Sequence, residues 1–177
     1  KREVCDNDVI AAFIEKTATY TVLGPSVCGA ILAGKTTEQA EQLLTEFSVN
    51  AGVAFQIKDD LLGIYGNEKI IGKTVNGDIA EGKKSLLVSH FDRVADDKTK
   101  QLFYAHYGKG ETNEDDAQII RRLFEENGCR TYAEQKMREY FEKAKSEILA
   151  LPAKIKTDES ALNELLLFIE FLENRQK

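Results

Sequence analysis

The sequence predicts an all-α protein, and three observations lead to this prediction. The 177 residues include only two prolines and 12 glycines, whereas Glu, Lys, Leu and Ala, which favour helices, are abundant. Apolar residues recur every three to four positions over most of the chain, as they do on the buried face of an amphipathic helix. No internal repeat or linker divides the sequence. We therefore expect one helical domain over residues 1–177, large enough to bury a sizeable core.

The start of the chain predicts a helix from about Asn7 to Leu23, with Asp6 or Asn7 as its N-cap. The pair Gly24-Pro25 is expected to interrupt this helix, because proline lacks a backbone N–H and its ring clashes with the preceding turn. A short apolar helix is expected next, over about residues 26–33.

A long helix over about residues 38–65, capped by Thr36 or Thr37, is the expected centre of the core. Residues 66–84 carry four glycines and no sustained periodicity, so we expect a long functional loop there. Thr112 is expected to cap a later helix, and Pro152 to separate the last two. Helices are expected at about residues 85–95, 97–107, 112–128, 130–151 and 160–174.

Composition excludes several classes of protein. A formal net charge of −6 argues against a general nucleic-acid-binding surface, which would be basic. Cys5, Cys28 and Cys129 are widely spaced, so we expect reduced thiols in a cytoplasmic protein rather than structural zinc. No apolar run reaches the ~18–20 residues that a membrane span needs. The chain begins Lys1-Arg2 without methionine, and we expect it to be part of a longer polypeptide.

A polar run inside the long central helix points to a functional site. Gln56, Asp59 and Asp60 lie at helical spacing on one face, within an otherwise apolar segment. Unpaired carboxylates on such a face would each cost several kcal/mol to desolvate. Carboxylate oxygens suit Mg²⁺, which usually takes one or two of them together with waters and substrate phosphates. The run therefore predicts a metal site.

Nearby cations extend this prediction to a diphosphate. Lys73 follows a glycine in the expected loop, and Asp78 precedes Lys83 and Lys84. On the opening helix, Lys16-Thr17 places a further cation and a hydroxyl group. Lysines of this kind are the partners that a phosphorylated substrate requires.

These motifs together resemble the C-terminal half of the trans-isoprenyl diphosphate synthases, the family of farnesyl and geranylgeranyl diphosphate synthases. The resemblance covers essentially the whole chain, and its combination of motifs is highly specific. The matching pieces are Lys16-Thr17-Ala18, Gly24-Pro25, Phe55-Gln56-Ile57-Lys58-Asp59-Asp60, Gly72-Lys73, Asp78-Ile79-Ala80-Glu81-Gly82-Lys83-Lys84 and Tyr107-Gly108-Lys109.

The resemblance implies an all-α isoprenoid-synthase bundle around a central cavity, with its N-terminal helices missing. It implies a homodimeric prenyltransferase of isoprenoid biosynthesis, in which three Mg²⁺ ions bridge an allylic diphosphate to two acidic walls. Departure of diphosphate leaves an allylic carbocation, which isopentenyl diphosphate attacks head-to-tail before a proton is lost.

Individual roles follow from the same resemblance. It implies that Asp59 holds Mg²⁺ directly, that Asp60 supports it, and that Asp78 orients a lysine or a metal-bound water. Lysines are implied to contact the allylic diphosphate, and Thr17 and Gln56 to lie near the departing group. The diphosphate-binding lysines are Lys16, Lys73 and Lys83.

Two departures from the family pattern stand out. Its second acidic motif is Asp-Asp-x-x-Asp, and Gly63 replaces the last aspartate here. The first acidic motif is absent from the sequence, since Asp96-Asp97 and Asp115-Asp116 are explained by helix capping. We therefore expect residues 1–177 alone to be inactive.

Other interpretations remain open at this point. The chain could be a non-catalytic partner subunit of a prenyl synthase or, less consistent with its lysines, a class I terpene cyclase. Asp59 and Asp60 alone would usually form a solvated helix face, and Lys16 alone a surface lysine. Product chain length and the preferred allylic primer cannot be read from these residues.

Overall fold

The computed structural model describes residues 4–66 and 76–176. The regular structure in these ranges is helical, which confirms the all-α prediction. The elements are α1 (Asp6–Phe13), η1 (Ile14–Leu23), α2 (Gly24–Leu32), α3 (Thr37–Tyr65), α5 (Gly77–Glu81), α6 (Leu86–Val94), α7 (Asp97–His106), α8 (Glu114–Glu126), α9 (Cys129–Lys154) and α10 (Glu159–Asn174).

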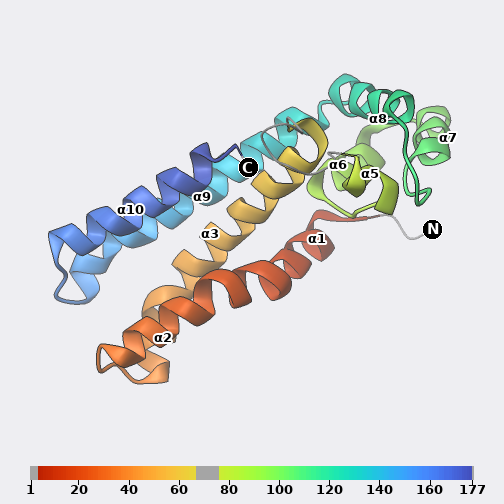
Figure 1. The fold of residues 1–177 in the computed structure, drawn as a ribbon. Helices are drawn as coiled ribbons and strands as arrows, with labels where there is room; N and C mark the ends of the chain where they lie inside the picture. Colours follow the sequence, from red (N-terminus) through yellow and green to blue (C-terminus); the bar gives the residue numbers. More distant parts are fainter. Residues whose placement is uncertain (1–3, 67–75, 177) are drawn as a thin grey trace. The chain divides into compact units, whose positions relative to one another are not determined.

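The chain divides into two compact units, and α1, α3 and α9 each contribute to both (Figure 1). Unit 1 comprises residues 1–9, 57–135 and 176–177, and unit 2 comprises residues 10–56 and 136–175. Each unit is described separately below.

Unit 1 is organised around a cluster of aromatic rings from three consecutive helices and the turn after the second. The ring of Phe103 on α7 stacks on Phe91 of α6 and on Tyr107, with centroid distances of 4.3 and 4.6 Å. Phe124 of α8 lies 5.2 Å from Phe103. All four residues are buried. Such pairs stabilise a core beyond their burial of apolar area, so this cluster gives the helices around α5 a rigid support.

Unit 2 is built from close helix pairs. In Figure 1, α10 runs back along α9, and Lys145 of α9 pairs with Glu173 of α10 at 2.9 Å. On another side of this unit, Gly52 of α3 faces Ala18 of η1. A Cβ atom at Gly52 would lie 2.4 Å from the Ala18 Cα atom, so the two backbones approach closely only because residue 52 is glycine.

The predicted break at Gly24-Pro25 is wrong. Both Leu23 and Gly24 have right-handed helical angles, and the helical path continues from η1 directly into α2. Pro25 is the second residue of α2, directly after the π-helical segment. The preceding ten residues form a π-helix, in which the Gly24 N–H reaches back to the carbonyl of Thr19. This wider turn accommodates the proline without ending the helix.

Helix starts follow the expected capping chemistry with small shifts. Thr36 and Gln39 exchange side-chain and backbone hydrogen bonds before α3, which is a capping box. Asp96 accepts from the Thr99 N–H at the start of α7, as expected. Before α8 the cap is Asn113 rather than Thr112.

Two further expectations need correction at their edges. Pro152 lies inside the last turn of α9 instead of separating two helices, and α9 ends at Lys154. The expected loop over residues 66–84 contains a short helix, α5. Lys73 lies outside the described residues.

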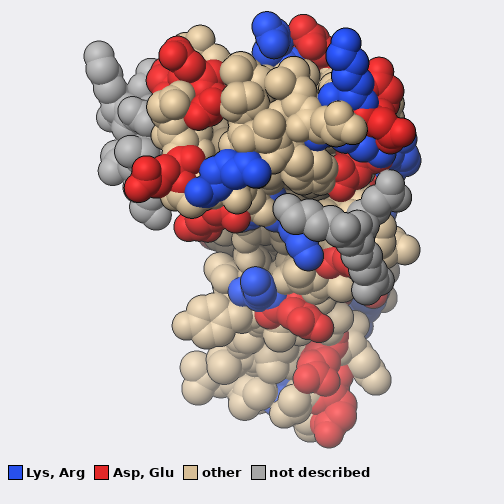
Figure 2. Space-filling model, turned by 90° about the vertical axis from the view of Figure 1, so that its right-hand side faces the viewer, with Lys and Arg blue, Asp and Glu red and all other residues tan. Residues whose placement is uncertain are grey.

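Lysines and arginines lie among aspartates and glutamates on the face drawn in Figure 2. Of the helices in the described ranges, none is both long and apolar enough to cross a bilayer.

Candidate functional site

Three residues predicted from the sequence meet in unit 1 and are called the Lys83 cluster: Asp60, Asp78 and Lys83. The Lys83 Nζ atom lies 3.0 Å from an oxygen of Asp60 and 2.9 Å from an oxygen of Asp78. Asp60 is only 3% exposed. Burial disfavours the charge on Lys83, but the two carboxylates outweigh it and raise the pKa of the ammonium group. Lys83 therefore stays charged between two acids.

A glycine turn places Lys83 in this position. Gly82 ends α5 in the left-handed conformation, with φ of +68°, which glycine adopts at no steric cost. The Lys83 N–H then donates to the carbonyl of Asp78 at 3.0 Å. The turn thus folds the chain back so that Lys83 and Asp78, five residues apart in sequence, reach the same point.

Residues 107–110 form hydrogen bonds to this turn and to α5. The buried Tyr107 hydroxyl donates to the Lys83 carbonyl at 2.6 Å. The N–H groups of Gly108 and Gly110 donate to the carbonyls of Ile79 and Ala80 at 2.9 and 2.8 Å. The short helix α5 is therefore attached by its backbone to the end of α7, whose aromatic residues form the core of unit 1.

Arg121 of α8 forms hydrogen bonds at the N-terminal end of α5. Its Nε atom donates to the Ile64 carbonyl at 2.7 Å, and its terminal nitrogens reach Asn76 at 2.7 Å and Glu114 at 3.0 Å. Asn76 is the N-cap position of α5. One guanidinium group thereby joins the end of α3 to the start of α5. Its partner Ile64 follows Asp60 by four residues, and its partner Asn76 precedes Asp78 by two.

Sequence reasoning did not identify Tyr107, Arg121 or Asn76 as supports of the site. Their partners lie 24 to 57 residues away along the chain. Tyr107 belongs to the matched piece Tyr107-Gly108-Lys109, but no periodicity or motif gives the partners of these residues, because the contacts depend on how the helices pack.

Two further residues named from the sequence are neighbours of the Lys83 cluster along the chain. Asp59 is half-buried and precedes Asp60 directly. Lys84, expected to be a rim charge, is exposed.

A second group of predicted residues belongs to unit 2. The Thr17 hydroxyl donates to the Gln56 side-chain oxygen at 2.6 Å, across 39 residues of sequence. Thr17 is buried in the π-helix η1, whereas Lys16 beside it is exposed. Helices of this type are rare and often occur at functional sites. Thr17 and Gln56, both predicted to lie near the departing diphosphate, are thus in direct contact.

The donor chemistry of the Lys83 cluster fits a divalent cation. Among residues 4–66 and 76–176, no three His, Cys, Asp or Glu side chains converge to hold a metal by themselves. Mg²⁺ does not require such a cage, since it binds through one or two carboxylates, waters and substrate phosphates. Asp60 and Asp78 converge on Lys83 from α3 and α5, and Asp59 directly precedes Asp60. Carboxylate oxygens are the ligands that suit such a cation.

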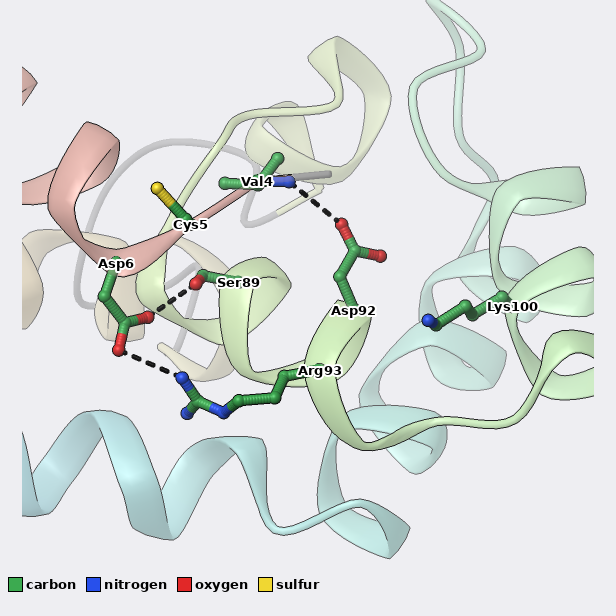
Figure 3. A pocket seen from close by; sticks show the side chains of 7 residues that line it. All are labelled: Val4, Cys5, Asp6, Ser89, Asp92, Arg93 and Lys100. Atoms are coloured by element: carbon green, nitrogen blue, oxygen red, sulfur yellow. Dashed lines mark hydrogen bonds and ion pairs between the residues drawn. The ribbon is translucent and has the colours of Figure 1, made fainter. Parts of the chain in front are cut away.

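A different polar group in unit 1 is called the Asp6 cluster: Asp6, Ser89, Arg93 and Tyr132. It borders a pocket of about 380 Å³ (Figure 3). Asp6 accepts from Ser89 at 2.5 Å, from Arg93 at 3.2 Å and from the Tyr132 hydroxyl. Burial opposes the charge of Asp6, but these donors lower the pKa of its carboxyl group. Three donors thus converge on one carboxylate. Their hydrogen bonds join the start of α1 to α6 and α9.

The sequence is similar to a known protein family and to individual members of it. Residues 6–124 match the family model described as polyprenyl synthetase. The chain is 33% identical over 144 residues to a geranylgeranyl diphosphate synthase of Saccharolobus solfataricus and 36% identical over 141 residues to a geranylfarnesyl diphosphate synthase of Aeropyrum pernix. Each match covers 80% of this chain and 43% of the relative. The chain thus spans less than half the length of these two relatives.

Solved structures give the same result. A geranylgeranyl pyrophosphate synthetase of Pyrococcus horikoshii superposes with a TM-score of 0.82 at 30% identity, over 99% of this chain and 51% of that one. A geranylgeranyl pyrophosphate synthase of Corynebacterium glutamicum, solved with isoprenyl diphosphate and magnesium, gives 0.82 at 26% identity, over 94% and 46%. Fold, motifs and similarity agree, and the chain belongs to the polyprenyl synthetase family.

Proposed function

We propose that this chain provides the second acidic wall and the diphosphate-binding lysines of a short-chain polyprenyl diphosphate synthase. The reaction is the head-to-tail condensation of isopentenyl diphosphate with an allylic diphosphate. The observation that carries the proposal is the Lys83 cluster, in which two carboxylates on separate helices share one charged lysine. The synthase names of the relatives favour this function over a non-catalytic partner subunit.

The chain's own groups have distinct roles in this proposal. Asp59 and Asp60 hold the metal, while Lys16 and Lys73 bind the allylic diphosphate. An ammonium group has three N–H donors, one more than Asp60 and Asp78 use, so Lys83 donates the third to the same diphosphate.

Thr17 and Gln56 act beside the leaving group as a hydrogen-bonded pair. Because Thr17 donates to the Gln56 oxygen, the amide of Gln56 is held in one orientation with its N–H₂ group directed away from Thr17. A fixed donor stabilises developing negative charge without reorganising during the reaction.

A divalent metal, when bound, neutralises the charge that builds up on the departing diphosphate. The lysines supply the same stabilisation from fixed positions, and the effect is larger in the transition state than in the ground state. The Corynebacterium structure with magnesium and isoprenyl diphosphate supports this choice of metal and ligand. A count of three Mg²⁺ ions, a homodimer and a cytoplasmic location remain predictions.

The test is prenyl transfer from labelled isopentenyl diphosphate, measured on the native polypeptide that carries these residues, with Mg²⁺ and with EDTA. Asp59→Ala should reduce the rate by about 10²–10³-fold, as loss of a group that stabilises the leaving charge does elsewhere. Asp96→Ala is the control, because Asp96 caps α7 and should leave the rate within a factor of about two.

Two results would contradict the proposal. Equal losses from Asp59→Ala and Asp96→Ala would mean that residue 59 is structural. Measurable turnover by residues 1–177 alone would show that the first acidic motif is not required.

A further inference from the structure

Arg121 links α8 to the end of α3 and to the N-cap residue of α5, and each of its three nitrogens has a different partner. The Nε atom donates to the Ile64 carbonyl, and the two terminal nitrogens donate to Asn76 and Glu114. The Arg121 side chain is only 21% exposed. A guanidinium group can serve three partners at once because its donors form a rigid planar fork.

Asn76 gives a second, independent indication that this link is specific. An asparagine at an N-cap usually accepts a hydrogen bond from an N–H group of the first helical turn. Within the described residues 76–81, the Asn76 side chain makes no such bond. Its oxygen accepts from Arg121 instead, and its amide nitrogen donates to Glu114 at 3.1 Å. Arg121, Asn76 and Glu114 thus form a closed triangle of hydrogen bonds.

The triangle lies close to the carboxylates of the Lys83 cluster along both helices. Ile64 is one helical turn after Asp60, on the same face of α3. Its carbonyl belongs to the last turn of α3, where carbonyls have no partner within the helix. Asn76 is separated from Asp78 by a single residue. Arg121 therefore fixes the end of α3 and the start of α5 at one point.

The Arg121 contacts differ in kind from the other connection between α3 and α5. Lys83 also joins the two helices, but through Asp60 and Asp78, and Lys83 and Asp60 are proposed to bind the diphosphate and the metal. The partners of Arg121 are a backbone carbonyl, an amide and Glu114, none of which is proposed to bind either ligand. The Arg121 contacts can therefore persist while the Lys83 cluster engages its ligand.

We infer that Arg121 is a positioning residue of the diphosphate site, which holds α3 and α5 at the separation that brings Asp60, Asp78 and Lys83 together. It acts through the rigid geometry of its guanidinium group and not through its charge. The inference rests on the proposed diphosphate function for the effect on ligand binding. The effect on the geometry of the cluster is independent of that function.

The effect on binding is measured by calorimetry of the full chain with inorganic pyrophosphate, in Mg²⁺ and in EDTA, below the Tm of every variant. Arg121→Met should weaken the Mg²⁺-dependent binding by about 10-fold, as loss of a supporting contact does at other metal sites. Arg121→Lys should weaken it nearly as much, because a single ammonium nitrogen keeps the charge but lacks the fork.

The matched control is Arg122→Met on the same helix. Arg122 is 61% exposed and pairs with Glu126 of α8 at 3.8 Å. Exposed pairs of this kind contribute little. Binding by this variant should stay within about two-fold of the wild type.

The effect on geometry is measured by thermal unfolding in EDTA. Arg121 and Lys83 bond to different groups, and substitutions at such residues usually add in their effects on stability. Lys83→Met should nevertheless lower Tm in an Arg121→Met background by no more than about half as much as in the wild type, because the two carboxylates are no longer held against Lys83. In an Arg122→Met background the decrease should equal that in the wild type.

Each outcome has a separate meaning. Weaker binding by both Arg121 variants, with Arg122→Met unchanged, supports the inference. Unchanged binding by Arg121→Met overturns it, because Arg121 then only stabilises the fold, and recovery of binding by Arg121→Lys overturns it in favour of a charge effect. Equal decreases of Tm from Lys83→Met with and without Arg121 also overturn it, whatever the chain binds. Absence of Mg²⁺-dependent binding by the wild type would overturn the proposed function, and the Tm comparison would still decide the effect on geometry.

Discussion

The Lys83 cluster and the Asp6 cluster lie in the same unit, and both join distant segments through carboxylates, yet their charges are arranged in opposite ways. At Asp6 one carboxylate receives hydrogen bonds from a serine, a tyrosine and an arginine. At Lys83 one ammonium group is shared between two carboxylates, and Asp59 lies beside them. Several donors converge on one carboxylate in the first cluster, and two carboxylates converge on one cation in the second.

This difference shows which polar cluster suits a ligand. A carboxylate that is satisfied by its neighbours gains little from a further cation, so the Asp6 cluster is complete as a structural contact. Two carboxylates that converge on one lysine bring several charged oxygens together, and such oxygens suit a divalent ion. A pocket of about 380 Å³ lies beside Asp6, but the carboxylate oxygens of the Lys83 cluster are the better chemical match to a divalent ion.

The largest expected effect comes from removing the cation of the Lys83 cluster. Lys83→Met should lower the free energy of unfolding by about 3 kcal/mol in EDTA, because it removes the cation that a buried Asp60 shares with Asp78. Mg²⁺ should restore part of this loss by replacing the missing positive charge. Urea unfolding in EDTA and in Mg²⁺ measures both quantities.

Arg93→Met is the matched control at the Asp6 cluster. The Arg93 side chain is half-exposed, and Ser89 and Tyr132 still donate to Asp6. The loss should stay below about 1 kcal/mol, without a response to Mg²⁺. Equal responses of the two variants to Mg²⁺ would erase the distinction between the clusters.

Removal of one carboxylate from each cluster should separate binding from stability. Asp60→Asn should weaken the Mg²⁺-dependent binding of pyrophosphate by at least about 10–100-fold, because it removes a charged oxygen donor. Asp6→Asn should leave that binding within about two-fold while lowering stability. Calorimetry on both variants provides the comparison, and a similar loss of binding from Asp6→Asn would count against the assignment of the site.

A smaller effect is expected from replacing a glycine in the turn that carries Lys83. Gly82 and Gly110 both have positive φ, but a Cβ at Gly82 would also meet the Gly108 Cα at 2.8 Å, whereas a Cβ at Gly110 meets nothing within 4 Å. Gly110→Ala should cost about 1 kcal/mol from its backbone conformation alone, and Gly82→Ala about 2 kcal/mol or more. Denaturant unfolding measures the difference. Equal costs would mean that the contact between the two turns contributes nothing.

The smallest effect is a pH dependence at the Asp6 cluster. Because the pKa of Asp6 is lower in the folded chain than its ordinary value, the ionised carboxyl stabilises the fold above about pH 4. This contribution is lost as the pH falls through the folded pKa. The free energy of unfolding of the wild type should therefore fall more steeply between about pH 4 and 2 than that of Asp6→Asn. Parallel curves for the two proteins would contradict the shift.

Much of the fold could be predicted from the sequence because the determining signals are local. Helical periodicity marked the helices, and Asp96 was recognised as a cap from its position before an apolar run. The break expected at Gly24-Pro25 failed for a local reason too. Both residues are compatible with a helix start, and the π-helical turns before them absorb the proline.

The residues of the candidate site could be predicted from short motifs and from the family resemblance that these motifs carry. The pattern from Gln56 to Asp60, and Asp78 with Lys83, could be identified from spacing and residue type. The surroundings of Gly63 could not, because the nearest atoms to a Cβ there belong to Asp78 on another helix. Supports such as Arg121 reach across 57 residues, and packing alone brings them to the site.

The central claim is that the Lys83 cluster, and not the Asp6 cluster, holds a divalent ion together with a diphosphate. The most direct measurement is anomalous diffraction from crystals of the chain grown with Mn²⁺, in place of Mg²⁺, and inorganic pyrophosphate. We expect an anomalous peak beside the carboxylates of Asp59 and Asp60, with pyrophosphate next to Lys83. A peak in the pocket beside Asp6, or no peak at Asp59 and Asp60, would contradict it.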